Sequence, residues 1–94
     1  MTNHLDLEFR QTPNRLVLWA NQTLALGEIT WELAADVMTI NHTFVQPEYR
    51  GQGIAEELVA EAVEIARENN YRVVPLCPFA KKEFERKIEY QDLL

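Results

Sequence analysis

The stretch of the sequence best suited to bind a ligand is RGQGIA, which consists of Arg50, Gly51, Gln52, Gly53, Ile54 and Ala55. Its two glycines let the backbone approach a ligand without a Cβ atom in the way. The N–H groups of residues 52–55 fall at or just before an expected helix start, where they have no acceptor within the helix. The partial positive charge at a helix N-terminus adds to this effect. The segment therefore predicts a binding site for a phosphate or pyrophosphate.

Two familiar phosphate-binding patterns do not fit this segment. No Gly-Lys-Ser or Gly-Lys-Thr follows the glycines, so it is not a P-loop. Glu56 stands where the dinucleotide-binding fingerprint needs its third glycine. The strands expected before the segment also form a meander and not a βαβ unit. The ligand is thus a phosphate compound of another kind.

Cys77 and His42 are the side chains best suited to catalysis. A thiolate is a nucleophile, and Pro78 predicts a helix start that would favour the thiolate form of Cys77. We expect Cys77 to be a reactive thiol, the alternative being a small buried apolar residue. His42 could act as a general base, the alternative being a histidine bonded to a neighbour on a sheet face. Glu48 is a further candidate base.

Alternating apolar residues predict several strands. The connections between them are too short for parallel crossovers, so the strands should form an antiparallel meander. Near Gly27 the alternation slips, which predicts a bulge. In the third strand the alternation puts His42 and Phe44 on the same face as Met38 and Ile40. The expected strands are 15–20, 23–33 and 37–45, with a possible edge strand before residue 13 that carries Leu5, Leu7 and Phe9.

Residues 53–69 show helical periodicity, with glutamates on one side and apolar residues on the other. A short strand over 71–77 follows, and its Pro75 requires a bulge or a sheet edge. A second helix is expected over about 79–88, and the final leucines are expected to dock on the body. The fold class is α+β, with a mixed sheet and the long helix packed on it.

The 94 residues predict a single domain, 1–94. A net charge of −6 without a basic face argues against a nucleic-acid partner. Cys77 is the only cysteine, which favours a reducing, cytoplasmic setting. Neither a signal peptide nor a membrane span is expected. His4, His42 and Cys77 lack ligand spacing, so no metal site is expected.

Arg50, Gly53 and Ala55 match the cofactor motif of the GCN5-related N-acetyltransferase superfamily, which is Arg or Gln, two residues, Gly, one residue, then Gly or Ala. The chain resembles in particular a branch of small, single-domain acetyltransferase-like proteins. That resemblance covers about residues 15–94 and includes the segments HTFVQPEYRGQGIA, VVPLCPF and EY-x-DLL.

The resemblance implies acetyl-CoA as cofactor and an unknown amine as acceptor. The strand ending at Thr43, Phe44 and Val45 would splay from the strand near Val74. The gap would take the pantetheine arm, with Cys77 near it as a thiol that could take the acetyl group transiently. The 52–55 amides would bind pyrophosphate, and Arg50 would close the loop or touch phosphate. Lys81 and Lys82 would meet the adenosine phosphates.

We expect the chain to lack the N-terminal helices and the C-terminal hairpin that shape the acceptor site in larger relatives. The catalytic tyrosine of many larger relatives has no secure equivalent here, and Tyr90 is the nearest candidate in sequence. Two alternatives therefore stay open: a CoA or acyl-CoA binding module without turnover, and an interaction domain that kept only the fold. The chain would be a monomer or a homodimer.

Overall fold

Five strands form one mixed sheet in the order β1-β2-β3-β4-β5, and helices follow the fourth and fifth strands. The structure is a computed structural model that describes residues 6–94, so Leu5 and His4 lie outside the described residues. The elements are β1 (Leu7–Thr12), β2 (Arg15–Ala20), β3 (Leu24–Ala34), β4 (Val37–Val45), α1 (Ile54–Glu68), β5 (Arg72–Pro75) and α2 (Pro78–Arg86), with two 3-10 helices, η1 (Pro47–Tyr49) and η2 (Ile88–Leu93).

Strands β1 to β4 form the expected antiparallel meander. The tight β2–β3 turn holds Asn21 and Gln22 at positive φ, and the N–H of Thr23 closes it by donating to the carbonyl of Ala20 at 3.2 Å. The long crossover through α1 brings β5 in parallel to β4. The fold class predicted from the sequence is thus confirmed, and β1 is the edge strand expected near Leu7 and Phe9.

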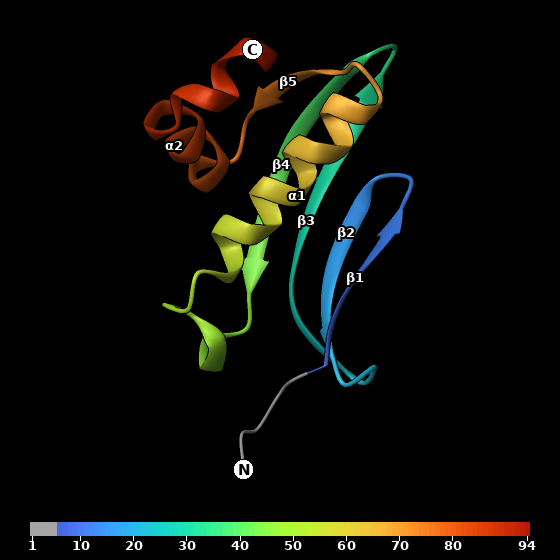
Figure 1. The fold of residues 1–94 in the computed structure, drawn as a ribbon, viewed down its shortest axis with the longest axis vertical. Helices are drawn as coiled ribbons and strands as arrows, with labels where there is room; N and C mark the ends of the chain where they lie inside the picture. Colours follow the sequence, from blue (N-terminus) through green and yellow to red (C-terminus); the bar gives the residue numbers. More distant parts are fainter. Residues whose placement is uncertain (1–5) are drawn as a thin grey trace.

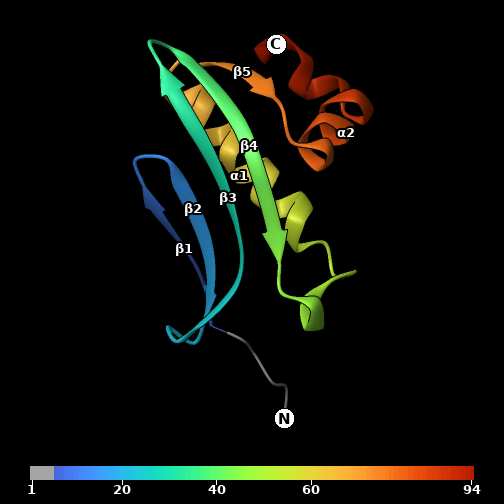
Figure 2. The same ribbon diagram turned by 180° about the vertical axis from the view of Figure 1, so that it is seen from behind.

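Helix α1 packs on one face of the sheet and buries its apolar side against β2, β3 and β4 (Figure 1). Leu58, Val59 and Ala62 of α1 are fully buried against Ile29 and Trp31 of β3 and their neighbours. Helix α2 lies beside β5 at the sheet edge. Seen from behind, the other face of the sheet carries no helix within residues 6–94 (Figure 2).

Two bulges interrupt the meander. The first makes Leu26 of β3 the extra residue opposite Leu18 and Trp19, next to Gly27 as predicted. The second lies in β4, where Thr30 pairs with His42 and Trp31 pairs with Ile40, so that Asn41 is the extra residue. The Thr30 hydroxyl lies 2.6 Å from Asn41 Oδ1.

The bulge at Asn41 corrects one expectation. The sequence pattern put His42 and Phe44 on the face of Met38 and Ile40, which are fully buried under α1. One inserted residue reverses the alternation of side chains along a strand. His42 and Phe44 therefore lie on the helix-free face, whereas Thr43 and Val45 turn toward α1.

Strands β4 and β5 part after Ile40. Their parallel pairing ends where Ile40 faces Pro75, and the Ile40 carbonyl accepts bonds from the N–H groups of Leu76 (2.9 Å) and Cys77 (3.0 Å). Beyond this point β4 pairs only with β3 within residues 6–94. The predicted splay is therefore present, and Pro75 lies at the sheet edge, where its missing N–H costs nothing.

The end of the chain docks on α1 and α2 through η2. Arg67 of α1 donates hydrogen bonds to the carboxylate of Asp92 and to the carbonyl of Glu89. Leu93 is buried in the core as expected, whereas Leu94 is 48% exposed, so only one of the two leucines docks fully. Across residues 6–94, every helix is too short or too polar to cross a membrane.

Candidate functional site

A pocket of about 460 Å³ opens between the end of β4, the loop over residues 46–53 and the start of α1. We call it the loop pocket. Its walls come from β4, the loop, the first turn of α1 and α2, namely Thr43, Phe44, Val45, Tyr49, Arg50, Gly51, Gly53, Ile54, Ala55, Glu56 and Phe79. It lies on the side where β4 has left β5.

The glycines of the loop are required by its backbone shape. Gly51 and Gly53 adopt φ values of 82° and 83°, a region that L side chains rarely enter. A Cβ atom built at either position meets nothing within 4 Å, so the space above them is open. Gly53 is the N-cap of α1 and has no side chain to occupy the helix end. This open cradle fits a bulky anionic group.

The backbone N–H groups at the start of α1 are free to donate hydrogen bonds to such an anion. The first backbone bond of the helix runs from Glu57 N to Gly53 O (3.1 Å), so the amides of Ile54, Ala55 and Glu56 have no acceptor within the helix. Helix α1 has 15 residues, enough for its dipole to favour an anion at this end. Gln52 is exposed and outside the pocket wall.

Arg50 holds the loop against the end of β4. Its Nε donates to the carbonyl of Val45 at 2.9 Å, and its guanidinium lies 5.6 Å from the centroid of the Phe44 ring. The sequence left open whether Arg50 closes the loop or touches phosphate. The bond to Val45 uses Nε, so Arg50 closes the loop, and the residue also lines the pocket.

Three wall residues were missed by the sequence analysis. Thr43 was expected at the end of the splayed strand, but the bulge at Asn41 puts its side chain on the face opposite to the one that the alternation indicated. Tyr49 and Glu56 are the residues directly before and after the RGQGIA segment, and only this position in the sequence could have indicated that they line the pocket. Phe79 reaches the pocket only through the packing of α2, which no local pattern reveals. Glu56 places a carboxylate on the wall of a pocket that otherwise suits an anion.

Cys77 lies behind the wall of the loop pocket. Its sulfur is 3.2 Å from the hydroxyl of Thr43 and accepts a hydrogen bond from the N–H of Ala80 at 3.3 Å. The side chain is thus the N-cap of α2 and is 7% exposed. It lies at the end of β5 beside a helix N-terminus, as the sequence indicated.

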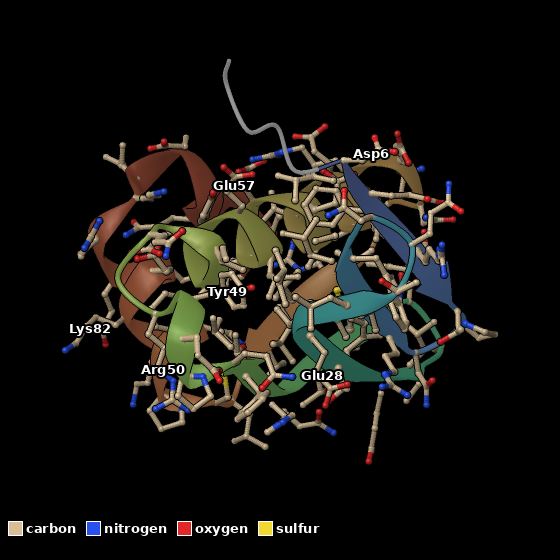
Figure 3. All side chains as sticks on the ribbon, turned by 90° about the horizontal axis from the view of Figure 1, so that it is seen from below. Asp6, Glu28, Tyr49, Arg50, Glu57 and Lys82 are labelled. Carbon is tan, nitrogen blue, oxygen red and sulfur yellow. The ribbon has the colours of Figure 1, made fainter. Side chains whose placement is uncertain are left out.

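His42 lies on the other face of β4. Its Nε2 is 3.6 Å from Oε2 of Glu28, whose Oε1 is 2.8 Å from Nη2 of Arg15. The His42 ring is parallel to that of Phe44, with centroids 6.5 Å apart. Figure 3 shows Glu28 on the side of the sheet away from α1. The structure therefore does not bring the His42 and Cys77 side chains together on one face.

The two lysines of α2 lie in different places. Lys81 lines a separate hollow of about 270 Å³ with Pro75, Phe84 and Leu94. Lys82 is exposed and lies one turn along α2 from Phe79, and it extends outward from the helix (Figure 3). Of the two lysines, only Lys82 lies on the same side of α2 as Phe79, which lines the loop pocket. Glu48 and Tyr90 are not part of that wall, and Tyr90 packs on Phe84 instead.

The sequence profile of the GCN5-related N-acetyl-transferase family matches residues 15–93. The chain belongs to this family, which confirms the resemblance found in the sequence. Membership supports N-acetyltransferase activity in general, in a family that uses acetyl-CoA. The comparison with curated protein sequences gave no match.

Solved structures support the assignment. The NMR structure of a GCN5-like protein from Staphylococcus aureus is 37% identical, with a TM-score of 0.77 over 94% of this chain and 87% of that one. The ribosomal-protein-S18-alanine N-acetyltransferase of Escherichia coli is 17% identical, with a TM-score of 0.65 over 81% of this chain and 53% of that one.

An aminoglycoside N-acetyltransferase in complex with CoA is 19% identical, with a TM-score of 0.54 over 88% of this chain and 60% of that one. The protein described here spans only 53% of the length of the E. coli enzyme and 60% of the length of the aminoglycoside N-acetyltransferase. These two matches therefore show the shared fold and carry no information about a substrate.

Proposed function

We propose that this protein transfers an acetyl group from acetyl-CoA to an amine. The observation that carries the proposal is the position of the loop pocket. Its open glycine cradle and unpaired α1 amides lie at the wide end of the gap between β4 and β5. An elongated ligand with a pyrophosphate in the cradle would thus run along β4 toward Cys77.

The residues present fit such a ligand. The amides of residues 52–55 would hold the pyrophosphate, and Arg50 would add its Nη groups. Phe44 and Val45 would border the pantetheine arm, and Lys82 would contact the adenosine phosphates. Lys81 would reach them only by turning from its own hollow. Acetyl-CoA supplies an activated thioester carbonyl, and backbone amides of β4 beyond Ile40 would polarise it.

Two side chains are proposed for the chemistry. His42, on the helix-free face, would take the proton of an ammonium acceptor that arrives from that side. Cys77, on the α1 side behind Thr43, would serve a variant route in which it carries the acetyl group first. Because the two lie on opposite faces of β4, we propose them as separate routes. A His42→Gln variant that transfers acetyl at the wild-type rate would remove His42 from the mechanism.

A CoA-binding module without turnover is the alternative, favoured by the second face of the sheet, which no helix of residues 6–94 covers. A broad panel of amines that yields no acetylated product despite tight binding would support it. We further propose that the protein acts in the cytoplasm as a monomer or homodimer.

Isothermal titration with acetyl-CoA tests the cofactor site. We expect saturable binding that is lost in Gly53→Glu, because the new carboxylate would occupy the cradle. Gly53→Gln is the matched control, since it carries the same bulk and backbone strain without the charge. Binding should be weaker in Gly53→Gln but still measurable. The proposal is wrong if wild-type protein binds no acetyl-CoA, or if Gly53→Glu binds it as tightly as wild type.

A further inference from the structure

A second hollow, of about 220 Å³, lies on the sheet face away from α1, and we call it the face hollow. Residues of β2, β3 and β4 and the following loop line it, namely Arg15, Val17, Ala25, Gly27, Glu28, Phe44 and Gln46. Strand register agrees with this placement, since Val17 pairs with Glu28 and Glu28 pairs with Phe44. Paired residues share a face of the sheet. No helix covers this face anywhere in residues 6–94 (Figure 2).

One positive and one negative group lie side by side in the face hollow. Nη2 of Arg15 is 2.8 Å from Oε1 of Glu28, and the second carboxylate oxygen faces His42 at 3.6 Å. The Arg15 side chain is 54% exposed and that of Glu28 is 26% exposed, so both remain accessible. Exposed ion pairs add little to stability, so the fold does not require this pair.

The face hollow and the loop pocket share one wall. Among residues 6–94, only Phe44 lines both. The guanidinium of Arg50 lies 5.6 Å from the centroid of its ring, and the parallel ring of His42 lies 6.5 Å away, centroid to centroid. A ligand in the face hollow is therefore separated by one aromatic side chain from a ligand in the loop pocket. His42 stands beside this wall, at the strand position where β4 has just left β5.

The charges of the face hollow indicate what it would hold. An amine with a single positive charge would bind weakly, because the attraction of Glu28 is offset by the repulsion of Arg15. A ligand with an ammonium and a carboxylate close together gains from both residues, since each of its charges faces an opposite one. The volume is below the range of about 300–1,000 Å³ typical of drug-sized ligands, so the ligand is small.

We propose that the face hollow binds the acetyl acceptor and that this acceptor is a small α-amino acid. Its ammonium lies at Glu28, its carboxylate at Arg15, and its side chain lies along Val17, Ala25 and Phe44. The inference rests on the proposed acetyl transfer. The ammonium loses one proton to His42, and its nitrogen bonds to the acetyl carbon as the C–S bond breaks. The CoA thiolate leaves and takes up the second proton that this nitrogen loses, so the products are an N-acetyl amino acid and CoA.

The test is an NMR titration of ¹⁵N-labelled protein, with and without CoA. The probes are L-alanine, ethylamine, which lacks the carboxylate, and propionate, which lacks the amine. We expect L-alanine to shift the amide signals around Val17, Gly27 and Gln46. Ethylamine and propionate should bind about tenfold more weakly, because each loses one charge-assisted contact.

Two variants and one control make the test specific. Arg15→Gln should abolish the preference for alanine over ethylamine, and Glu28→Gln the preference for alanine over propionate. Arg10→Gln is the control, because Arg10 pairs with Val17 on the same face and forms an ion pair with Glu8 outside the hollow. The spectra also report whether each variant is folded.

Equal binding of alanine and ethylamine to wild-type protein would overturn the inference, as would unchanged discrimination in Arg15→Gln. If acetyl-CoA binds by calorimetry while alanine shifts no signal near the hollow, the proposed function survives and this inference fails. If alanine binds as expected but acetyl-CoA does not, the hollow stands as an amino-acid site and the proposed acetyl transfer fails.

Discussion

The hydroxyl of Thr43 lies 3.2 Å from the sulfur of Cys77 and joins the wall of the loop pocket to the first turn of α2. Thr43 lies on β4 and Cys77 follows β5, and both come after the point where the two strands separate. The sulfur also accepts the N–H of Ala80, so a single atom is both the cap of a helix and a candidate nucleophile.

Incubation with acetyl-CoA should leave an acetyl group on Cys77 if the two-step route operates. Mass spectrometry of the intact protein would then show an addition of about 42 Da that is absent from Cys77→Ser. The route requires the sulfur to be reached past Thr43, so Thr43→Val should change the rate of labelling. Wild-type protein that transfers acetyl without the added mass would exclude the two-step route.

The capping role of Cys77 gives a separate, structural expectation. Cys77→Ala should destabilise the protein by about 1 kcal/mol, because the N–H of Ala80 loses its acceptor. Cys77→Ser keeps an acceptor and should be close to wild type in urea denaturation. Equal losses in the two variants would show that packing of the sulfur matters and that capping does not.

Removing the charge of Glu56 should strengthen binding of acetyl-CoA. Its side chain lines the pocket that we assign to the pyrophosphate, whereas Glu57 is in the same first turn but outside that wall. Titration calorimetry should give several-fold tighter binding for Glu56→Gln than for wild type. Both Glu56→Gln and Glu57→Gln should lose about 0.3–1 kcal/mol of stability, since each removes an anion from a helix N-terminus.

The matched variant keeps the test specific. If Glu57→Gln tightens binding as much as Glu56→Gln, the effect comes from overall charge and not from the pocket wall. Unchanged binding in both would argue against a pyrophosphate at this helix end.

Gly27 should not tolerate a side chain. A Cβ atom there would lie 2.7 Å from the carbonyl oxygen of Phe44 and 3.3 Å from Cδ1 of Leu58. Gly27→Ala must push β4 or α1 outward and should cost about 1–3 kcal/mol in urea denaturation. Gly51→Ala meets no atom within 4 Å and should cost only the strain of its positive φ, about 1–2 kcal/mol. A fully stable Gly27→Ala would show that the strands adjust freely.

The ion pair of Arg67 and Asp92 should make stability depend on pH. The hydrogen bond from Arg67 holds the pKa of Asp92 below its ordinary value of 3.8. The unfolded chain therefore binds more protons in this range, so the stabilisation is complete above pH 3.8 and is lost as the pH falls through the lower folded pKa.

Melting temperatures of wild type and Asp92→Asn provide the measurement. Wild type should melt higher at pH 7, and the difference should shrink below pH 3.8. Glu85→Gln, an exposed acid outside this ion pair, is the control and should show no such trend. A difference that is constant from pH 7 to pH 3 would mean that η2 is held by packing alone.

Much of the fold could be predicted because its signals are local. The apolar side of α1, the apolar run of β2 and the glycines before Ile54 each fix an element within a few residues. Turn lengths then allow only an antiparallel meander. The cofactor loop is predictable for the same reason, since Gly51, Gly53 and the helix start are neighbours in sequence.

What failed depends on register and on tertiary packing. A bulge needs a comparison of two strands, so the extra residue at Asn41 left no mark in the alternation of β4. The position of His42 was therefore expected on the buried face. The positions of Phe79 and Lys81 depend on how α2 is rotated about its axis where it packs beside β5. Glu28 was not predicted as a site residue, because the residues that it contacts lie on other strands.

The shared ring of Phe44 has a thermodynamic consequence. If a ligand on one side of the ring fixes its orientation, the ligand on the other side meets a wall already set for it. If the first ligand raises the affinity of the protein for the second by some factor, the second must raise the affinity for the first by the same factor. Cooperativity between two ligands in so small a chain would therefore require no domain movement, only the rotation of one side chain.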